Sequence, residues 1–211
     1  MTARWIASEL VDLVLPRSCL GCGRPGVAVC RGCVAPQLSA TVVAGLSIVA
    51  AGTYGGTIRA ALLSYKERGR RDLAGPLAEL LGHAVDACGG HVLVPIPSTP
   101  GAARRRGGDH VHRLARLASR SSQRPVVDSL RLARRVLDSS GLDSRQRSAN
   151  LYGAMRAAPP PSAASALIVD DIVTTATTVR EAARALRAAG WRVSGAAVVA
   201  ATARRRASLP G

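Results

Sequence analysis

The chain has 211 residues, a formal net charge of +16, 47% hydrophobic residues and 2% aromatic residues. This length suffices for one full domain with a substantial core plus a small accessory module. No apolar run approaches the ~20 residues of a membrane span, and the first residues lack the apolar core of a signal peptide, so we expect a cytoplasmic protein. The scarcity of aromatic side chains leaves little for stacking nucleic-acid bases.

The positive charge is carried almost entirely by arginine. Lys66 is the only lysine among the 29 basic residues, a bias typical of GC-rich codon usage, but this bias does not explain why acidic residues number only 13. The basic residues gather at 68–71, 104–106, 113–135 and 204–206. Two interpretations stay open, contact with the phosphates of DNA or RNA and a pyrophosphate-binding or merely solvated role.

The first predicted elements are a short amphipathic helix before Pro16 and two Cys-x-x-Cys pairs. Four thiolates at this spacing can surround one ion tetrahedrally, which is the geometry of structural Zn²⁺. A disulfide framework and a redox pair are the alternatives, but a cytosolic chain with one further thiol, Cys88, favours the metal. The predicted zinc ligands are Cys19, Cys22, Cys30 and Cys33.

Two helices are predicted in the middle of the chain. The first follows the Gly55-Gly56 turn and reaches Lys66. The second is expected to have Asp72 as its N-cap and to continue to Cys88, which lies on its apolar face.

A buried strand is predicted next, at residues 91–98, followed by Arg104–Arg106 within a Gly-rich stretch. Another helix is expected to start near Asp109. His110 and His112, at its beginning, are predicted to be solvated surface residues rather than bases.

Near the C-terminus an apolar, β-branched run ends in Asp170 and Asp171, and a Thr-rich turn follows. Ligands of open α/β sheets bind beyond the carboxyl ends of the strands. Backbone N–H groups, hydroxyls and the helix dipole in the turn suit a phosphate, whereas the carboxylates suit neutral ribose hydroxyls or Mg²⁺. A helix ending before Gly190 and a strand over 191–201 would complete a βαβ unit. The alternative is a strand end with an ordinary Thr cap.

This segment resembles the 5-phosphoribosyl-1-pyrophosphate (PRPP) loop of type I phosphoribosyltransferases. The resemblance implies that the acidic pair holds the ribose hydroxyls, that the turn holds the 5′-phosphate, and that Ser98 lies in a pyrophosphate loop. The implied substrate-binding residues are Asp170, Asp171, Thr174, Thr175, Ala176, Thr177, Thr178 and Ser98. Two positions depart from the pattern. Ala176 replaces a Gly that would permit positive φ, and Thr174 replaces the Asp taken to be the base of purine-salvage members, so purine transfer by that route is not expected.

Several stretches are similar to the ComF (ComFC, GntX-like) family: residues 15–23, 64–69, 94–97, 106–109, 147–154 and 169–171. Gly107-Gly108-Asp109 departs from the family's Gly-Phe-Asn type sequence, whereas Arg147 and Asn150 match its signature. The resemblance implies a Cys₄ zinc module in residues 1–40 on an α/β, type I phosphoribosyltransferase domain in residues 41–211, a mostly parallel sheet flanked by helices.

The implied ligand is PRPP or a ribose 5-phosphate, with Mg²⁺ bridging the pyrophosphate. If the protein is catalytic, pyrophosphate is displaced at the anomeric carbon, with Asp170, Asp171, Lys66 and Arg106 as catalytic residues. Two alternatives remain, a non-catalytic scaffold for single-stranded DNA that works with a DNA-uptake helicase, as the family implies, and a PRPP-responsive regulator.

Overall fold

The computed structural model describes residues 18–133, 151–161 and 164–202. The predicted N-terminal helix, Arg147, Asn150 and the basic residues 204–206 lie outside this part of the chain. No helix of the described part has the length and apolarity needed to cross a membrane.

A five-stranded sheet forms the centre of the molecule, in the order β1-β2-β7-β6-β3. All neighbouring strands are parallel except β1, which pairs antiparallel with β2 in a hairpin. The mostly parallel sheet expected from the sequence is therefore confirmed. The strands are β1 (Ser39–Val43), β2 (Leu46–Thr53), β3 (Val92–Pro95), β6 (Ser165–Val173) and β7 (Arg192–Ala201).

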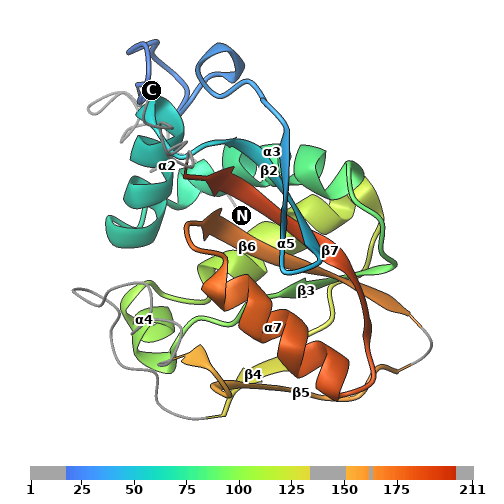
Figure 1. The fold of residues 1–211 in the computed structure, drawn as a ribbon. Helices are drawn as coiled ribbons and strands as arrows, with labels where there is room; N and C mark the ends of the chain where they lie inside the picture. Colours follow the sequence, from blue (N-terminus) through green and yellow to red (C-terminus); the bar gives the residue numbers. More distant parts are fainter. Residues whose placement is uncertain (1–17, 134–150, 162–163, 203–211) are drawn as a thin grey trace, which may run out of the picture.

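Helices cover both faces of this sheet (Figure 1). Along β6, Leu167 and Val169 enter one core with α2, α3 and α5, while Ala166 and Ile168 enter a second core with α7. Because successive residues of a strand point to opposite faces, a strand buried on both sides reads as a continuous apolar run. The principal helices are α2 (Gly56–Glu67), α3 (Ala74–Asp86), α5 (His110–Ser122) and α7 (Thr177–Ala188).

The predicted βαβ unit is present as β6–α7–β7, with the two strands parallel. The helix ends at Ala188, and Gly190 takes φ 90° just beyond it, as the sequence indicated. This unit places the segment 170–178 at the carboxyl end of a central strand.

The start of α3 differs from the prediction. A 3₁₀ turn, η2 (Arg71–Leu73), precedes the helix, and the N-cap is Leu73, which makes no side-chain capping bond. The Asp72 carboxylate instead accepts hydrogen bonds from Arg70, at 2.7 Å from NH2. Asp72 as N-cap is therefore wrong, because the neighbouring guanidinium binds its carboxylate bidentately.

The 100–109 region contains a short helix, α4 (Pro100–Arg105), where only a Gly-rich stretch was expected. Thr99 starts the helix, because its side-chain oxygen accepts a hydrogen bond from the N–H of Ala102 and Pro100 occupies the first helical turn. Arg104 and Arg105 are therefore presented on a helix rather than on a loop.

A second, two-stranded sheet of β4 (Leu130–Leu132) and β5 (Met155–Ala157) packs beside α7. The link between them is Glu181, which is 5% exposed. Its carboxylate accepts hydrogen bonds from the N–H of Met155 at 3.0 Å and from Arg184 at 2.7 Å. Burial favours the neutral acid, but the hydrogen bonds from Arg184 and the backbone outweigh it and lower the pKa of Glu181.

We expect Glu181→Ala to lower the free energy of unfolding by about 2–3 kcal/mol, because it leaves the N–H of Met155 without its carboxylate. Since the folded pKa is depressed, this contribution is present above the unfolded value of 4.5 and is lost as the pH falls below it. Urea unfolding at pH 7 and pH 3.5 measures both effects. Glu79→Ala is the control, because its pair with Arg31 is largely exposed and is worth less than about 1 kcal/mol. Equal losses for the two variants contradict the buried link.

Candidate functional site

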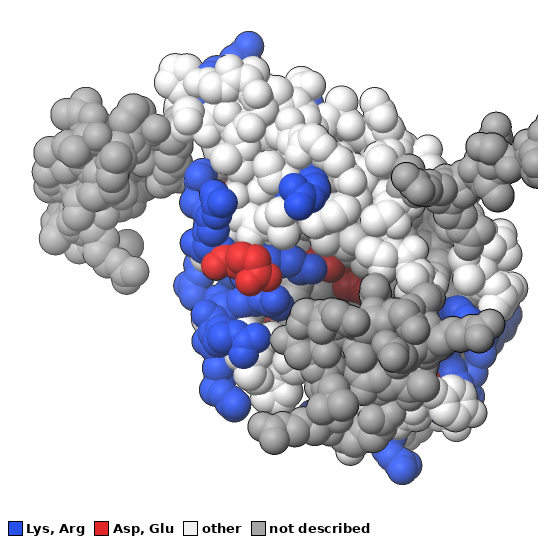
Figure 2. All heavy atoms as spheres, turned by 60° about the vertical axis from the view of Figure 1, so that its left-hand side comes forward, with Lys and Arg blue, Asp and Glu red and all other residues white. Residues whose placement is uncertain are grey.

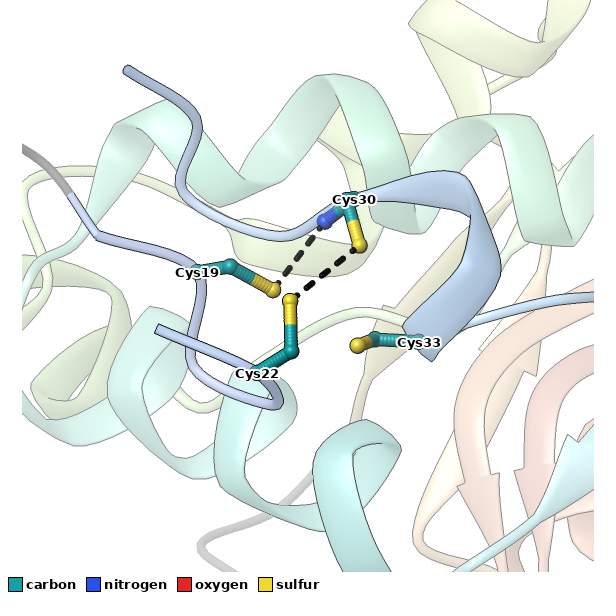
Figure 3. A group of neighbouring side chains, drawn as sticks. All are labelled: Cys19, Cys22, Cys30 and Cys33. Atoms are coloured by element: carbon teal, nitrogen blue, oxygen red, sulfur yellow. Dashed lines mark hydrogen bonds between the residues drawn. The ribbon is translucent and has the colours of Figure 1, made fainter. Parts of the chain in front are cut away.

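The four N-terminal cysteines converge from two short turns (Figure 3). Their sulfur atoms all lie within 4.8 Å of one another, and the Sγ atoms of Cys22 and Cys30 are 3.7 Å apart. Four sulfurs at about 2.3 Å from a central zinc are about 3.8 Å from each other, so the spacing fits a tetrahedral Zn²⁺ site. The four cysteines can thus hold the structural zinc that the sequence predicted.

The surroundings of the cluster affect two of its thiols in opposite directions. Hydrogen bonds from backbone N–H groups, first that of Cys22, lower the pKa of Cys19 to about 6. Contacts with the side chains of Cys30 and Cys22 raise the pKa of Cys33 to about 12. Because zinc binds thiolates, a zinc ion at this site would displace the protons of the cysteines.

Cys19 also joins this module to the main core, in which Val29 and Val34 of the module pack with α2 and α3. Gly21 lies where the module meets α2. A Cβ at this position would come within 2.7 Å of both the Cys33 sulfur and the Thr57 hydroxyl, so only glycine fits. By contrast, Cys88 is half-buried beside the core, as predicted, and burial raises its pKa.

The acidic pair lies at the carboxyl end of β6. Asp171 is 3% exposed, whereas Asp170 is half-buried and accepts a hydrogen bond from the N–H of Asp171 at 2.9 Å. Burial, and then the charge of Asp171, raise the pKa of Asp170. The two adjacent carboxyl groups are thus pushed toward different protonation states.

Asp171 is held by two side chains from other parts of the chain. Lys66, in the last turn of α2, places Nζ 2.6 Å from Oδ2, and His110, at the start of α5, places Nε2 2.8 Å from the same oxygen. Burial alone would raise the pKa of Asp171, but the Lys66 ammonium and His110 lower it below its ordinary value. Asp171 is therefore an ionised carboxylate with Lys66 as counter-ion.

The prediction that His110 is a solvated surface residue is wrong, since it is 7% exposed. The helix does start after Asp109, whose carboxylate caps the N–H groups of Val111 and His112. The first residue of α5 then points inward, because the Tyr65 hydroxyl donates to the His110 carbonyl at 3.1 Å and the two rings meet edge to face. His112 fits the prediction better, since it pairs with the exposed Asp128 at 3.0 Å.

Ser98 and Arg106 complete the surroundings of His110. The Ser98 Oγ lies 3.1 Å from His110 Nδ1, and Arg106 NH1 lies 3.4 Å from the same nitrogen. The N–H of Ser98 donates to Asp109 at 2.6 Å, which ties the 96–99 loop to α5. Thus Ser98, Arg106 and Asp171 meet around His110, and Lys66 contacts the same Asp171 oxygen. The sequence analysis predicted these four as site residues but placed His110 on the surface.

The Thr-rich turn runs from the end of β6 into α7. Thr174 and Thr175 are exposed, and the Thr175 and Thr177 hydroxyl oxygens are 2.9 Å apart. Ala176 is the N-cap of α7 and takes φ 58° and ψ 9°, in the left-handed region. The position therefore requires the conformation for which Gly is the usual residue, and Ala adopts it at a cost of about 1–2 kcal/mol.

Basic side chains gather on one side of the acidic pair. The Arg71 guanidinium donates to the Gly107 carbonyl at 3.1 Å, and Arg106 pairs with Glu67 at 3.2 Å, so the segments 66–71 and 104–113 adjoin. We call their basic residues the basic rim: Lys66, Arg68, Arg70, Arg71, Arg104, Arg105, Arg106 and Arg113. Figure 2 shows Lys and Arg side chains lining one side of a hollow that contains acidic groups.

The zinc site is tested by metal content. We expect purified protein to hold about one zinc per chain and Cys22→Ser to lose it, because a tetrahedral structural site needs all four thiolates. Inductively coupled plasma mass spectrometry measures the ratio. Cys88→Ser is the matched control and keeps the zinc, since Cys88 lies outside the cluster. Zinc retained in Cys22→Ser at the wild-type ratio contradicts the assignment.

The left-handed N-cap is tested by two substitutions of Ala176. We expect Ala176→Val to cost about 2 kcal/mol, because a buried β-branched residue is strained at positive φ. Ala176→Gly should change stability by less than about 1 kcal/mol, since relief of strain is offset by the entropy of the unfolded glycine. Ala188→Val, exposed in the last turn of α7, controls for helix propensity, and thermal unfolding measures all three. A harmless Ala176→Val overturns the assigned conformation.

Comparison with known proteins gives one family match. Residues 116–209 match the family model described as "Phosphoribosyl transferase domain", which is under half of the chain. No curated protein matches the sequence. Among solved structures, one described as "Structure of the allosteric regulatory enzyme of purine biosynthesis" is similar at 16% identity and a TM-score of 0.39. That likeness covers 60% of this chain and 26% of the other.

The matched segment contains α7, β6, β7 and the turn between the acidic pair and α7. The matched residues are thus similar to a phosphoribosyl transferase domain, and the chain has a mixed α/β fold with a mostly parallel central sheet and an N-terminal four-cysteine cluster that could bind zinc.

Proposed function

We propose that the protein binds PRPP, or a related ribose 5-phosphate, at the carboxyl end of β6, with Mg²⁺ bridging the pyrophosphate. The observation that carries the proposal is the order of groups along one strand end. A carboxylate pair, of which Asp171 is buried and Asp170 half-buried, is followed by an exposed hydroxyl-rich turn at the N-terminus of α7, and the basic rim adjoins the pair. A sugar with a phosphate on one side and a polyanion on the other matches this order.

The residues then take separate roles. Asp170 and Asp171 accept hydrogen bonds from the ribose hydroxyls, and the backbone and hydroxyls of 174–178 hold the 5′-phosphate at the positive end of the helix dipole. Ala176 replaces a glycine that would allow a closer approach, so we expect the phosphate to bind less tightly here than at a glycine turn.

If the protein is an enzyme, a nucleophilic atom of the acceptor forms a bond to the anomeric carbon of PRPP. The bond between that carbon and pyrophosphate breaks, and pyrophosphate leaves with the electron pair. Arg106 and Lys66 stabilise the departing charge, and bound Mg²⁺ would neutralise pyrophosphate oxygens. Position 174 is Thr rather than the Asp taken to be the general base of purine-salvage members, so this loop does not supply that base.

The second candidate is a ComF-type role in competence, with single-stranded DNA and a DNA-uptake helicase as partners, in the cytoplasm. The observation that favours it is the basic rim together with the net charge of +16, because Arg clusters bind nucleic-acid phosphates. In this proposal residues 1–40 form the zinc module and residues 41–211 the ligand-binding domain, which acts as a scaffold or as a PRPP-responsive regulator.

Isothermal titration calorimetry with PRPP, with and without Mg²⁺, tests the first proposal. We expect micromolar PRPP binding that needs Mg²⁺, and at least a tenfold loss in Asp171→Asn, because a neutral amide offers one weaker acceptor in place of the carboxylate. The control is Asp128→Asn, which removes the charge from an exposed Asp–His pair and should leave PRPP affinity unchanged. Salt-sensitive oligonucleotide binding without PRPP binding would favour the scaffold.

A further inference from the structure

His110 is a buried polar side chain to which the proposed reaction gives no role. Its ring bridges two groups of the site, with Nε2 2.8 Å from Asp171 Oδ2 and Nδ1 3.1 Å from Ser98 Oγ. One imidazole therefore connects the 96–99 loop, helix α5 and the distant strand β6.

The neighbours of the ring decide which nitrogen carries the proton. A guanidinium has only donors, and Arg106 NH1 lies 3.4 Å from Nδ1, so Nδ1 is the acceptor. In the neutral ring Nε2 then bears the hydrogen, which it donates to Asp171. Ser98 is also placed to donate its hydroxyl hydrogen to Nδ1, so the bonds run in one direction from Ser98 through His110 to Asp171.

The contacts of Asp171 are one-sided. Lys66 and His110 both contact Oδ2, so the carboxylate is fixed through one oxygen. Two partners on the same oxygen restrict the rotation of the carboxylate, which a single ammonium on a flexible stem does not do. A hydroxyl ligand therefore meets an acceptor that is already oriented.

The N–H of Ser98 is also engaged, by Asp109 at 2.6 Å. Both donors of Ser98 thus face the protein, one to the N-cap of α5 and one to His110. This arrangement does not suit a residue that holds pyrophosphate directly. It suits a residue that acts on Asp171 through the imidazole.

We propose that His110 is a positioning residue that orients Asp171 toward the ribose hydroxyls, and that Ser98 acts through His110 on the sugar rather than directly on the pyrophosphate. This inference rests on the proposed ribose phosphate site. It gives the 96–99 loop a role in binding ribose 5-phosphate, a ligand that has no pyrophosphate.

The test measures ribose 5-phosphate affinity by calorimetry in wild type, His110→Leu, His110→Gln and Ser98→Ala. We expect His110→Leu, which keeps the volume and loses the donor, to weaken binding about tenfold or more. His110→Gln, whose amide N–H₂ can still donate to Asp171, should stay within about threefold of wild type. A residue that only fills space gives the opposite order, because leucine packs better than glutamine at a buried position.

The double variant Ser98→Ala/His110→Leu tests the relay. We expect Ser98→Ala alone to weaken ribose 5-phosphate binding about threefold, and to add nothing in the His110→Leu background, because the two residues act in series. If Ser98→Ala weakens PRPP binding but leaves ribose 5-phosphate binding unchanged, the serine contacts the pyrophosphate and the inference is wrong.

The outcomes separate this inference from the function on which it rests. If wild type binds ribose 5-phosphate and His110→Leu binds it with the same affinity, the positioning role is wrong but the proposed sugar phosphate site is not contradicted. Absence of wild-type binding to both ribose 5-phosphate and PRPP overturns the site, and the positioning role with it. Thermal unfolding and zinc content equal to those of wild type show that a variant is folded. If His110→Leu does not fold, Ser98→Ala, in a half-buried loop, tests the positioning role instead.

Discussion

The buried charge of Asp171 is the constraint on which the site depends. An ionised carboxylate that is 3% exposed is costly unless charged and hydrogen-bonding partners compensate for it. Lys66 and His110 provide this compensation from the end of α2 and the start of α5. The positions of both helices relative to β6 are therefore tied to the ionisation of one side chain.

Asp171 lies at the edge of the sheet formed by the carboxyl ends of the parallel strands. Because β3, β6, β7 and β2 are parallel, their carboxyl ends meet at one edge, and the segments that follow them lie together there. The 96–99 loop follows β3 and the Thr-rich turn follows β6, so these two segments lie at the same edge of the sheet although they are far apart in the sequence. The basic rim extends this edge toward the solvent.

Two further features lie near Asp171 but do not contact it. Ala176 takes a left-handed conformation because the turn into α7 needs it, even though the side chain makes it less favourable. The cysteine cluster shares the core of α2 and α3, so a metal bound there would stabilise the helix whose last turn contains Lys66. The metal module and the acidic pair are thus connected through α2.

The sequence by itself determined the features that depend on neighbours along the chain. The Cys-x-x-Cys spacing predicted the metal cluster, the apolar run before Asp170 predicted the buried parallel strand, and the Asp109 cap predicted the start of α5. The tertiary structure alone decided that His110 points inward between Ser98 and Asp171, and that Lys66 contacts the same Asp171 oxygen. Periodicity places a residue on a helix, but packing against Tyr65 and β6 decides what its side chain touches, because burial and ion pairing arise between segments that the sequence keeps far apart.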